Sequence, residues 1–395
     1  MITRSRNFGL GVSNSIKDAP SSSELARVPP GGRFRSRCGQ PLRGSRRHQS
    51  PSCVGASSTQ LSARTKGASR RATCSRVLSW PFHRPGKYYR GAVSRVPSKV
   101  LVTESSSRDG LQSLGAFVPT AAKVGLIENL ASAGIRTFDA VSFVNPKAVP
   151  QMADGAEVIA GITNRGDVEL GGLVPNMKGF EAALAAGVDT IGLLTAASDE
   201  FNERNINATV DEAMHRIRRI LLEIPRGVST RSYISTATHC PFEGEQDPDW
   251  VAHLAETLIE WGSDTVYLGE TIGKATPFHI EALLDHVLEV VPADRVGIHL
   301  HDTYGQALAN TTVALERGVA RMDSSAGGLG GCPYAPGATG NIATEDLVYM
   351  LDGMGIETGI DLGGVANVAN DFCSAHNLSY NSRAGRAWLA SQDRE

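Results

Sequence analysis

From about residue 98 onward, short apolar runs alternate with segments long enough to form helices. A run of this kind followed by a helix-length segment is typical of a strand in a parallel sheet. Eight such runs are present, and eight is the number of strands that closes a (β/α)₈ barrel. The sequence therefore predicts an α/β protein with a TIM-barrel fold. The predicted strands span residues 99–104, 136–141, 169–174, 189–194, 231–235, 265–268, 295–300 and 320–323.

Local signals place several helix ends. An amphipathic helix is expected from Thr120 to Ala133 and another around 179–186. Thr209 followed three residues later by Glu212 predicts a capping box at a helix start. Four glycines stand just before predicted strands, where they would end the preceding helices in a left-handed conformation. These are Gly134, Gly187, Gly262 and Gly318.

Composition divides the chain into residues 1–97 and 98–395. The first part holds 19 of the 39 Lys and Arg but only Asp18 and Glu24 as acids, so it is a basic arm on an acidic body. It lacks apolar periodicity, which predicts a disordered extension. Three interpretations stay open: an organelle transit peptide, a tail that binds acidic surfaces, or upstream sequence from a misplaced start. Residues 98–395 are expected to form the barrel and a C-terminal helical segment.

The six cysteines show no Cys-x-x-Cys spacing, and no secretory segment or run of about 18 apolar residues is found. This predicts a protein of a reducing compartment, without a membrane partner. A bacterial cytoplasm is expected, with the mitochondrial matrix as the alternative if the arm is a transit peptide. No nucleic-acid partner is expected.

Chemically versatile side chains fall near the carboxyl ends of the predicted strands, where barrel enzymes keep their active sites. Two imidazoles two residues apart on a strand point the same way, which suits binding to one metal ion. A glycine-rich loop after the last strand carries a single cysteine. The candidate residues placed in this way are Arg108, Asp109, Asp139, Glu270, His299, His301 and Cys332.

Several motifs resemble the 3-hydroxy-3-methylglutaryl-CoA lyase family. The likeness runs from about Lys99 to Leu362, and the cysteine loop is its most specific part. The motifs are Ser107-Arg-Asp-Gly-Leu-Gln112, Ser142-Phe-Val-Asn-Pro-Lys147, Leu268-Gly-Glu-Thr-Ile-Gly273, His299-Leu-His-Asp-Thr-Tyr-Gly-Gln306 and Gly328-Leu-Gly-Gly-Cys-Pro-Tyr334.

The resemblance implies a site and its roles. Arg108 would face a thioester carbonyl, Cys332 would donate or accept a proton, and His299 would also shuttle a hydroxyl proton. Asn341 could in addition cap the helix that begins near Thr344. A divalent cation, Mg²⁺ or Mn²⁺, suits the mixed carboxylate, imidazole and amide ligation. Its ligands would be Asp109, His299, His301 and Asn341.

The implied reaction is cleavage of 3-hydroxy-3-methylglutaryl-CoA, or a close 3-hydroxyacyl-CoA, to acetyl-CoA and a 3-oxoacid such as acetoacetate. A cation lowers the pKa of the hydroxyl, and a positive donor stabilises the enolate that departs. We expect an acyl-CoA substrate, a homodimer, and a role in leucine degradation and ketone-body formation. One alternative is an acetyl-CoA-dependent condensing enzyme of the same barrel superfamily. Another is a non-catalytic protein that binds through its basic arm.

Two carboxylates depart from the family pattern. Asp139 stands where the family has Glu, and Glu270 stands where it has Asp. One side chain is a methylene shorter and the other a methylene longer, so the two changes are interpreted as compensating. We hypothesise that they face each other across the substrate and alter the preferred acyl group.

Overall fold

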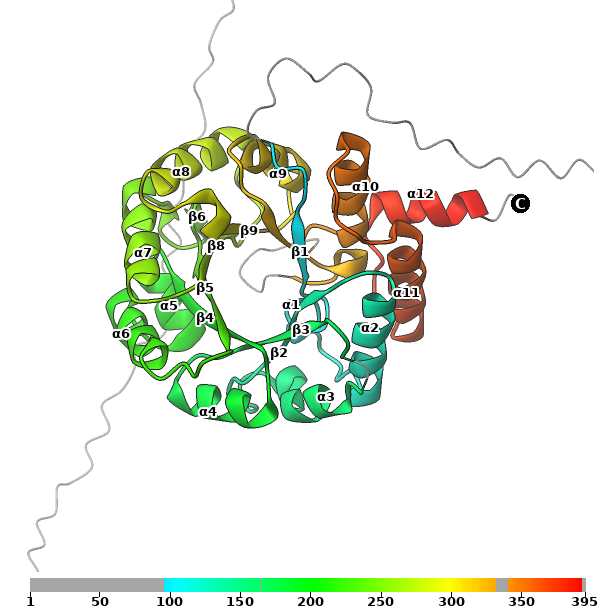
Figure 1. Ribbon diagram of the computed structural model, residues 1–395, viewed down its shortest axis with the longest axis horizontal. Coiled ribbons are helices and arrows are strands. Elements are labelled where there is room, and N and C mark those ends of the chain that lie inside the picture. The colour runs from blue at the N-terminus through cyan, green and yellow to red at the C-terminus, as the bar shows by residue number, and fades with distance from the viewer. Residues whose placement is uncertain (1–95, 164, 332–339, 393–395) are drawn as a thin grey trace, which may run out of the picture. The chain divides into compact units, whose positions relative to one another are not determined.

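The computed structural model describes residues 96–163, 165–331 and 340–392. Eight parallel strands form a closed barrel in the order β1-β10-β9-β8-β5-β4-β3-β2 (Figure 1). A ring of helices surrounds the barrel, as the predicted fold class requires. The barrel strands are β1 (Leu101–Glu104), β2 (Thr137–Ser142), β3 (Glu169–Leu173), β4 (Thr190–Ala196), β5 (Ser229–Ser235), β8 (Thr265–Glu270), β9 (Val296–Leu300) and β10 (Arg321–Ser324).

Each barrel strand is followed by at least one helix of the outer layer. A short hairpin of β6 (His239–Cys240) and β7 (Gly244–Glu245) lies between β5 and its helix. The α-helices are α1 (Asp109–Gln112), α2 (Thr120–Ser132), α3 (Gly155–Gly161), α4 (Met177–Ala186), α5 (Asp199–Ile206), α6 (Val210–Leu221), α7 (Pro248–Glu260), α8 (Pro277–Val290), α9 (Ala307–Glu316), α10 (Thr344–Met354), α11 (Leu362–Ala375) and α12 (Arg383–Gln392).

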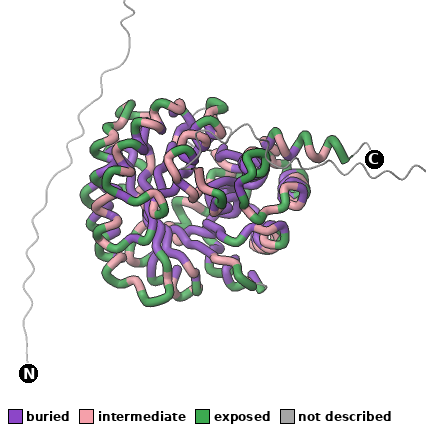
Figure 2. The backbone as a smooth tube through the Cα atoms, turned by 45° about the horizontal axis from the view of Figure 1, so that its top comes forward, coloured by how far each residue is buried: buried purple, intermediate pink, exposed green. Residues whose placement is uncertain are grey.

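The main hydrophobic core lies between the barrel strands and the helices that cover them (Figure 2). Inside the barrel a smaller cluster of Leu173, Tyr233 and Tyr267 fills the space between strands. Tyr267 pairs with Gly297 of β9 in register, and a Cβ at Gly297 would lie 2.5 Å from the tyrosine ring. A glycine at this position therefore lets the large ring pack inside the barrel.

The predicted strands and helix ends agree closely with the structure. Thr209 accepts a hydrogen bond from the N–H of Glu212, and the Glu212 side chain reaches back to Thr209, which confirms the capping box. The four glycines before strands all have positive φ, between 77° and 104°. Each of them ends a helix as predicted.

Three details of the prediction need correction. Residues 199–206 form helix α5, which the sequence analysis did not predict. The β6–β7 hairpin was not anticipated. Helix α10 is preceded by Ala343 and has no side-chain cap, so Asn341 does not cap it.

Helices α11 and α12 follow the eighth barrel helix, α10 (Figure 1). Within the part of the chain that the structure describes, no helix is long and apolar enough to cross a membrane.

Candidate active site

Most of the predicted site residues lie together at the carboxyl ends of the barrel strands. Arg108 and Asp109 follow β1, and Asp139 lies within β2. Glu270 is the last residue of β8. His299 lies near the end of β9 and His301 follows it. All six side chains are buried.

Asp109, His299 and His301 form a cluster whose ligand atoms all lie within 4.8 Å of one another. The Nε2 atom of His301 is 3.6 Å from Oδ2 of Asp109, and Nε2 of His299 is 3.8 Å from the same oxygen. The two imidazole rings stand at 86° with their centroids 5.3 Å apart. The predicted convergence of both rings on one point is therefore present.

Hydrogen bonds on the far side of each ring indicate where its proton lies. Nδ1 of His301 contacts the carbonyl oxygen of Thr271, which can only accept, so Nδ1 carries the proton. Nδ1 of His299 is 3.0 Å from Oδ2 of Asp323, which likewise accepts from it. Both Nε2 atoms are then left to present lone pairs toward the Asp109 carboxylate.

Two lone pairs and a carboxylate oxygen facing one another require a positive charge between them. Nε2 of His301 is buried and has no hydrogen-bond partner among the described residues. A proton on one Nε2 would satisfy only part of this arrangement, whereas a divalent cation would satisfy all three atoms. The residues present therefore fit the predicted metal ion.

The Asp109 carboxylate is fixed from both sides. Its Oδ1 atom accepts hydrogen bonds from Arg108 Nη1 at 2.7 Å and from Gln112 Nε2 at 2.6 Å. Burial alone would raise the pKa of Asp109, but Arg108 and the two histidines outweigh it and hold the pKa well below its usual value. Asp109 is therefore ionised across the physiological pH range, as a metal ligand must be.

Asn341 lies beside the same carboxylate, and its backbone pairs with that of His301. Its Nδ2 atom donates to Oδ2 of Asp109 at 2.8 Å and to the carbonyl of Leu329 at 3.2 Å. For Asn341 to ligate a cation, its amide must turn so that Oδ1 replaces Nδ2. The predicted ligand is thus adjacent to the cluster, and its ligation stays a prediction.

Arg108 and Asp139 form a buried ion pair in which Nε and Nη2 of the guanidinium both contact Oδ2 of the carboxylate. Burial would lower the pKa of Arg108, but Asp139 and Asp109 raise it further above its ordinary value. The guanidinium stays charged. Its bonds to these two carboxylates use three of its five N–H groups, so two can serve a ligand.

Glu270 lies on the opposite side of the barrel from Asp139, because β8 and β2 are four strands apart in either direction around the sheet. Its Oε1 atom accepts from the backbone N–H groups of Lys274 and Ala275 at 3.1 and 3.2 Å. Oε2 is buried and unpartnered among the described residues. Burial raises the pKa of Glu270, although neighbouring His301 opposes this.

The two roles predicted for His299 compete for one atom. Nδ1 is held by Asp323, so Nε2 would serve both as metal ligand and as proton acceptor. A single lone pair cannot do both at once. The pKa of His299 is raised, because Asp323 and Asp109 outweigh the opposing effect of burial.

Cys332 lies outside the described residues, which stop at Gly331 and resume at Gly340. The segment leading to it is held by two buried glutamates. Oε1 of Glu104 accepts from the N–H of Ala326 at 2.9 Å, and both oxygens of Glu345 accept from Gly327 at 3.0 Å. A Cβ added to Gly330 would lie 2.5 Å from Nδ2 of Asn341. The start of the cysteine loop therefore passes beside the metal cluster.

Four contributing residues were missed by the sequence analysis: Asp323, Gln112, Glu104 and Glu345. Asp323 and Glu104 lie within or at the end of barrel strands, where an isolated acid in an apolar run is a detectable signal. Both Gln112 and Glu345 lie on helices. Gln112 ends the Ser107–Gln112 motif but was given no role, and nothing in the local sequence of Glu345 distinguishes it from a surface residue.

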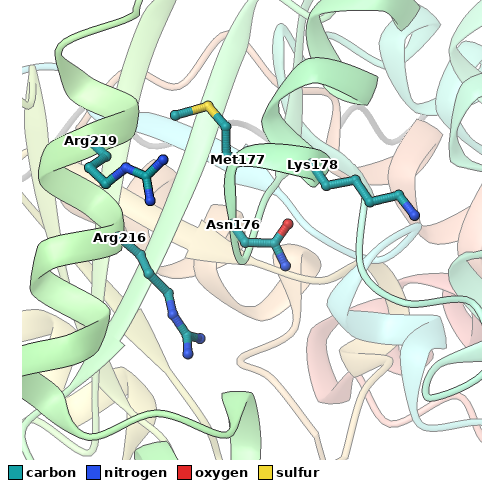
Figure 3. Close-up of a pocket in the computed structure, with 5 residues that line it drawn as sticks. All are labelled: Asn176, Met177, Lys178, Arg216 and Arg219. Atoms are coloured by element: carbon teal, nitrogen blue, oxygen red, sulfur yellow. The ribbon is translucent and has the colours of Figure 1, made fainter. Parts of the chain in front are cut away.

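A separate cavity of about 410 Å³ lies between the start of α4 and helix α6. In Figure 3, Arg216 and Arg219 extend from α6 toward Asn176 and Met177, while Lys178 extends away. Arg216 already donates to the carbonyls of Ile206 and Asn207, at 3.1 Å each. Among the predicted site residues that the structure describes, none lines this cavity.

Fold and site together define a (β/α)₈-barrel protein with a cluster of one carboxylate and two imidazoles, which could hold a metal ion, at the carboxyl ends of its strands. The chain belongs to the HMGL-like family, which matches residues 99–372. This confirms the family predicted from the motifs.

The similar proteins include both curated relatives and solved structures. The mitochondrial hydroxymethylglutaryl-CoA lyase of Bos taurus is 46% identical over 297 residues, which cover 75% of this chain and 91% of that protein. The crystal structure of hydroxymethylglutaryl-CoA lyase from Pseudomonas aeruginosa is 44% identical, with a TM-score of 0.73 and coverage of 75% and 99%. Another solved HMG-CoA lyase, in complex with coenzyme A and 3-methylmalate, is 36% identical, with a TM-score of 0.71 and coverage of 73% and 95%.

Proposed function

We propose that this chain is a divalent-cation-dependent carbon–carbon lyase that cleaves 3-hydroxy-3-methylglutaryl-CoA, or a close 3-hydroxyacyl-CoA, to acetyl-CoA and a 3-oxoacid such as acetoacetate. The observation that carries the proposal is the convergence of Asp109, His299 and His301 next to the Arg108 guanidinium. A cation site beside a permanently charged donor suits a reaction that generates an alkoxide and then an enolate.

Asp109, His299 and His301 would hold the cation, with Asn341 as a fourth ligand after its amide turns. When bound, a divalent cation supplies Lewis acidity that makes the substrate hydroxyl more acidic and fixes its orientation. The two free N–H groups of Arg108 would donate to the thioester oxygen as it gains charge. Asp139 positions the guanidinium by binding its Nε and Nη2 atoms.

Two proton transfers complete the cleavage. We assign removal of the hydroxyl proton to Oε2 of Glu270, because it is buried, unpartnered and next to His301. Loss of that proton lets the C–C bond break, which leaves a ketone on one fragment and the thioester enolate on the other. Cys332 would then protonate the enolate carbon, since a thiol with a pKa near ~8.5 is a suitable acid. His299 is kept as ligand in this assignment.

The decisive experiment measures acetyl-CoA release from a panel of 3-hydroxyacyl-CoA esters. The metal-stripped chain should be inactive, and Mg²⁺ or Mn²⁺ should restore turnover with 3-hydroxy-3-methylglutaryl-CoA or one analogue. Full activity without metal would overturn the site assignment. Consumption of acetyl-CoA, with no release from any ester, would favour a condensing enzyme instead.

The remaining parts of the proposal concern the setting of the enzyme. We propose a homodimer, which sedimentation of the purified chain would test. We also propose a bacterial cytoplasmic location, or the mitochondrial matrix if residues 1–97 are a cleaved transit peptide. N-terminal sequencing of the protein isolated from its cells separates the two, because a transit peptide would be absent from the mature chain.

A further inference from the structure

Three more metal-binding side chains lie together outside the candidate active site: His239, Glu245 and His279. Their ligand atoms all lie within 4.8 Å of one another. His239 and Glu245 are paired across the β6–β7 hairpin, and His279 lies in the first turn of α8. The cluster therefore joins two segments that follow neighbouring barrel strands, β5 and β8.

We propose that His239, Glu245 and His279 bind a second divalent cation, of the Zn²⁺ class. Two imidazoles and one carboxylate are a three-ligand set that zinc uses when its fourth position is open. Imidazole nitrogen favours zinc, copper or nickel over Mg²⁺. The proposed site lies outside the proposed catalytic centre, and it does not depend on which thioester the barrel cleaves.

His239 is the strongest evidence for a ligand. It is only 5% exposed, and its Nδ1 atom is buried without a hydrogen-bond partner among the described residues. Leaving a ring nitrogen buried and unpaired is destabilising, so its retention calls for an explanation. Burial, together with His279 and Lys274, lowers the pKa of His239.

His279 is oriented by the start of α8. Its Nδ1 atom accepts from the N–H of Thr276 at 3.0 Å and lies 2.8 Å from the Thr276 hydroxyl. Nε2 therefore carries the ring proton and is the nitrogen left for a ligand. A cation bound at Nε2 would displace that proton, and the ring must then turn so that a proton on Nδ1 no longer faces the N–H of Thr276.

The groups around His239, Glu245 and His279 leave room for a cation between them. The rings of His239 and His279 meet edge to face, with centroids 4.7 Å apart. Glu245 contributes negative charge, and Lys274, which opposes a cation, is exposed and screened by solvent. Cys240 is no ligand, because its thiol contacts Ser198 at 3.0 Å.

The test is to count zinc ions in the purified full-length chain. Wild type, His239→Gln, His279→Gln and the control His215→Gln are dialysed against Zn²⁺ and then analysed by atomic absorption. His215 is an exposed histidine of α6 outside both clusters. We expect wild type and His215→Gln to hold one zinc ion per chain more than the two cluster variants, whatever ion fills the catalytic centre. Equal zinc content in all four proteins would overturn the proposal.

A variant that should not disturb folding distinguishes loss of a zinc ligand from loss of zinc through misfolding. Glu245 is exposed, so Glu245→Gln should melt at the same temperature as wild type without zinc. It should bind the second zinc ion several-fold more weakly in a calorimetric titration. Unchanged affinity in this variant would remove Glu245 from the site and with it the proposed ligand set.

Discussion

Asp323 and His299 form a buried pair with 3.0 Å between Oδ2 of the carboxylate and Nδ1 of the ring. The pair fixes which nitrogen of His299 is protonated and turns Nε2 toward Asp109. A carboxylate behind a histidine ligand both orients the ring and raises its basicity. Asp323 would therefore act on a bound cation through His299.

Replacing Asp323 with Asn should weaken metal binding. The amide can present its own N–H to Nδ1, which shifts the ring proton to Nε2, where it competes with the cation. We expect Mg²⁺ or Mn²⁺ affinity to fall by ~10–100-fold, the usual effect of such partners. Metal titration of activity measures this, with the exposed Asp371→Asn of α11 as control. Equal metal affinity in both variants would contradict the orienting role.

Replacing Cys332 with Ala should lower kcat by ~10²–10⁴, the usual contribution of a positioned acid or base. Metal affinity and the melting temperature should change little, since the metal cluster is built from other residues. Alkylation of the wild-type thiol should have the same effect, and substrate should protect against it. Normal turnover by the Ala variant would show that the thiol takes no part in the reaction.

Asp139 and Glu270 lie on opposite strands of the barrel. That they face each other across the substrate stays a hypothesis. A methylene moves a carboxylate by about 1.5 Å. Misplacement by about 1 Å can cost ~10²-fold in rate. We therefore expect Asp139→Glu and Glu270→Asp to be poor enzymes singly, and the double variant to recover activity with a changed preference among 3-hydroxyacyl-CoA esters.

This test is a double-mutant cycle. It compares kcat/KM for wild type, the two single variants and the double variant. Additive effects on kcat/KM with unchanged substrate preference would refute the coupling. In that case 3-hydroxy-3-methylglutaryl-CoA itself would be the preferred ester.

Glu345 should make stability depend on pH. Burial raises its pKa from 4.5 to about 8, so the folded chain keeps a proton that the unfolded chain releases between these values. The free energy of unfolding should therefore fall as pH rises from about 4.5 to 8, and this group's contribution should level off above pH 8. At about 1.4 kcal/mol per pKa unit, Glu345 accounts for a loss of about 5 kcal/mol across the window.

Glu345→Gln removes the titration while keeping an oxygen for the N–H of Gly327. Denaturant unfolding at pH 5, 6.5 and 8 should show a flatter pH dependence for this variant than for wild type. Glu357→Gln, at an exposed ion pair with Lys99, is the matched control and should keep the wild-type slope. Parallel curves for all three proteins would contradict the prediction.

Regular patterns in the sequence were enough to predict the barrel. Each strand is a short apolar run, and features such as the Thr209 capping box depend only on neighbouring residues. Helix α5 was missed because Asp199–Ile206 is rich in charged and polar residues and carries no apolar stripe. The β6–β7 hairpin has only two residues in each strand, too few to show alternation.

Site residues at recognisable strand ends were predicted from the sequence. Site residues whose contacts join distant parts of the sequence were missed. His299 and His301 follow from the alternation of side chains along one strand. The pairing of Asp323 with His299 and of Glu345 with Gly327 depends on how separate elements are packed. Contacts between residues far apart in the sequence leave no local sequence pattern, so they could be identified only from the structure.

Asp109 and Asn341 meet across 232 residues of sequence, at the seam where β10 closes against β1. During synthesis the first of these residues emerges long before the second, so no partial barrel can present the whole cluster. If the proposed cation binds there, the entropy lost when the barrel closes would be coupled to its binding. Metal affinity would then report barrel closure: a chain that fails to join its first strand to its last should lose the ion even if every ligand residue is intact.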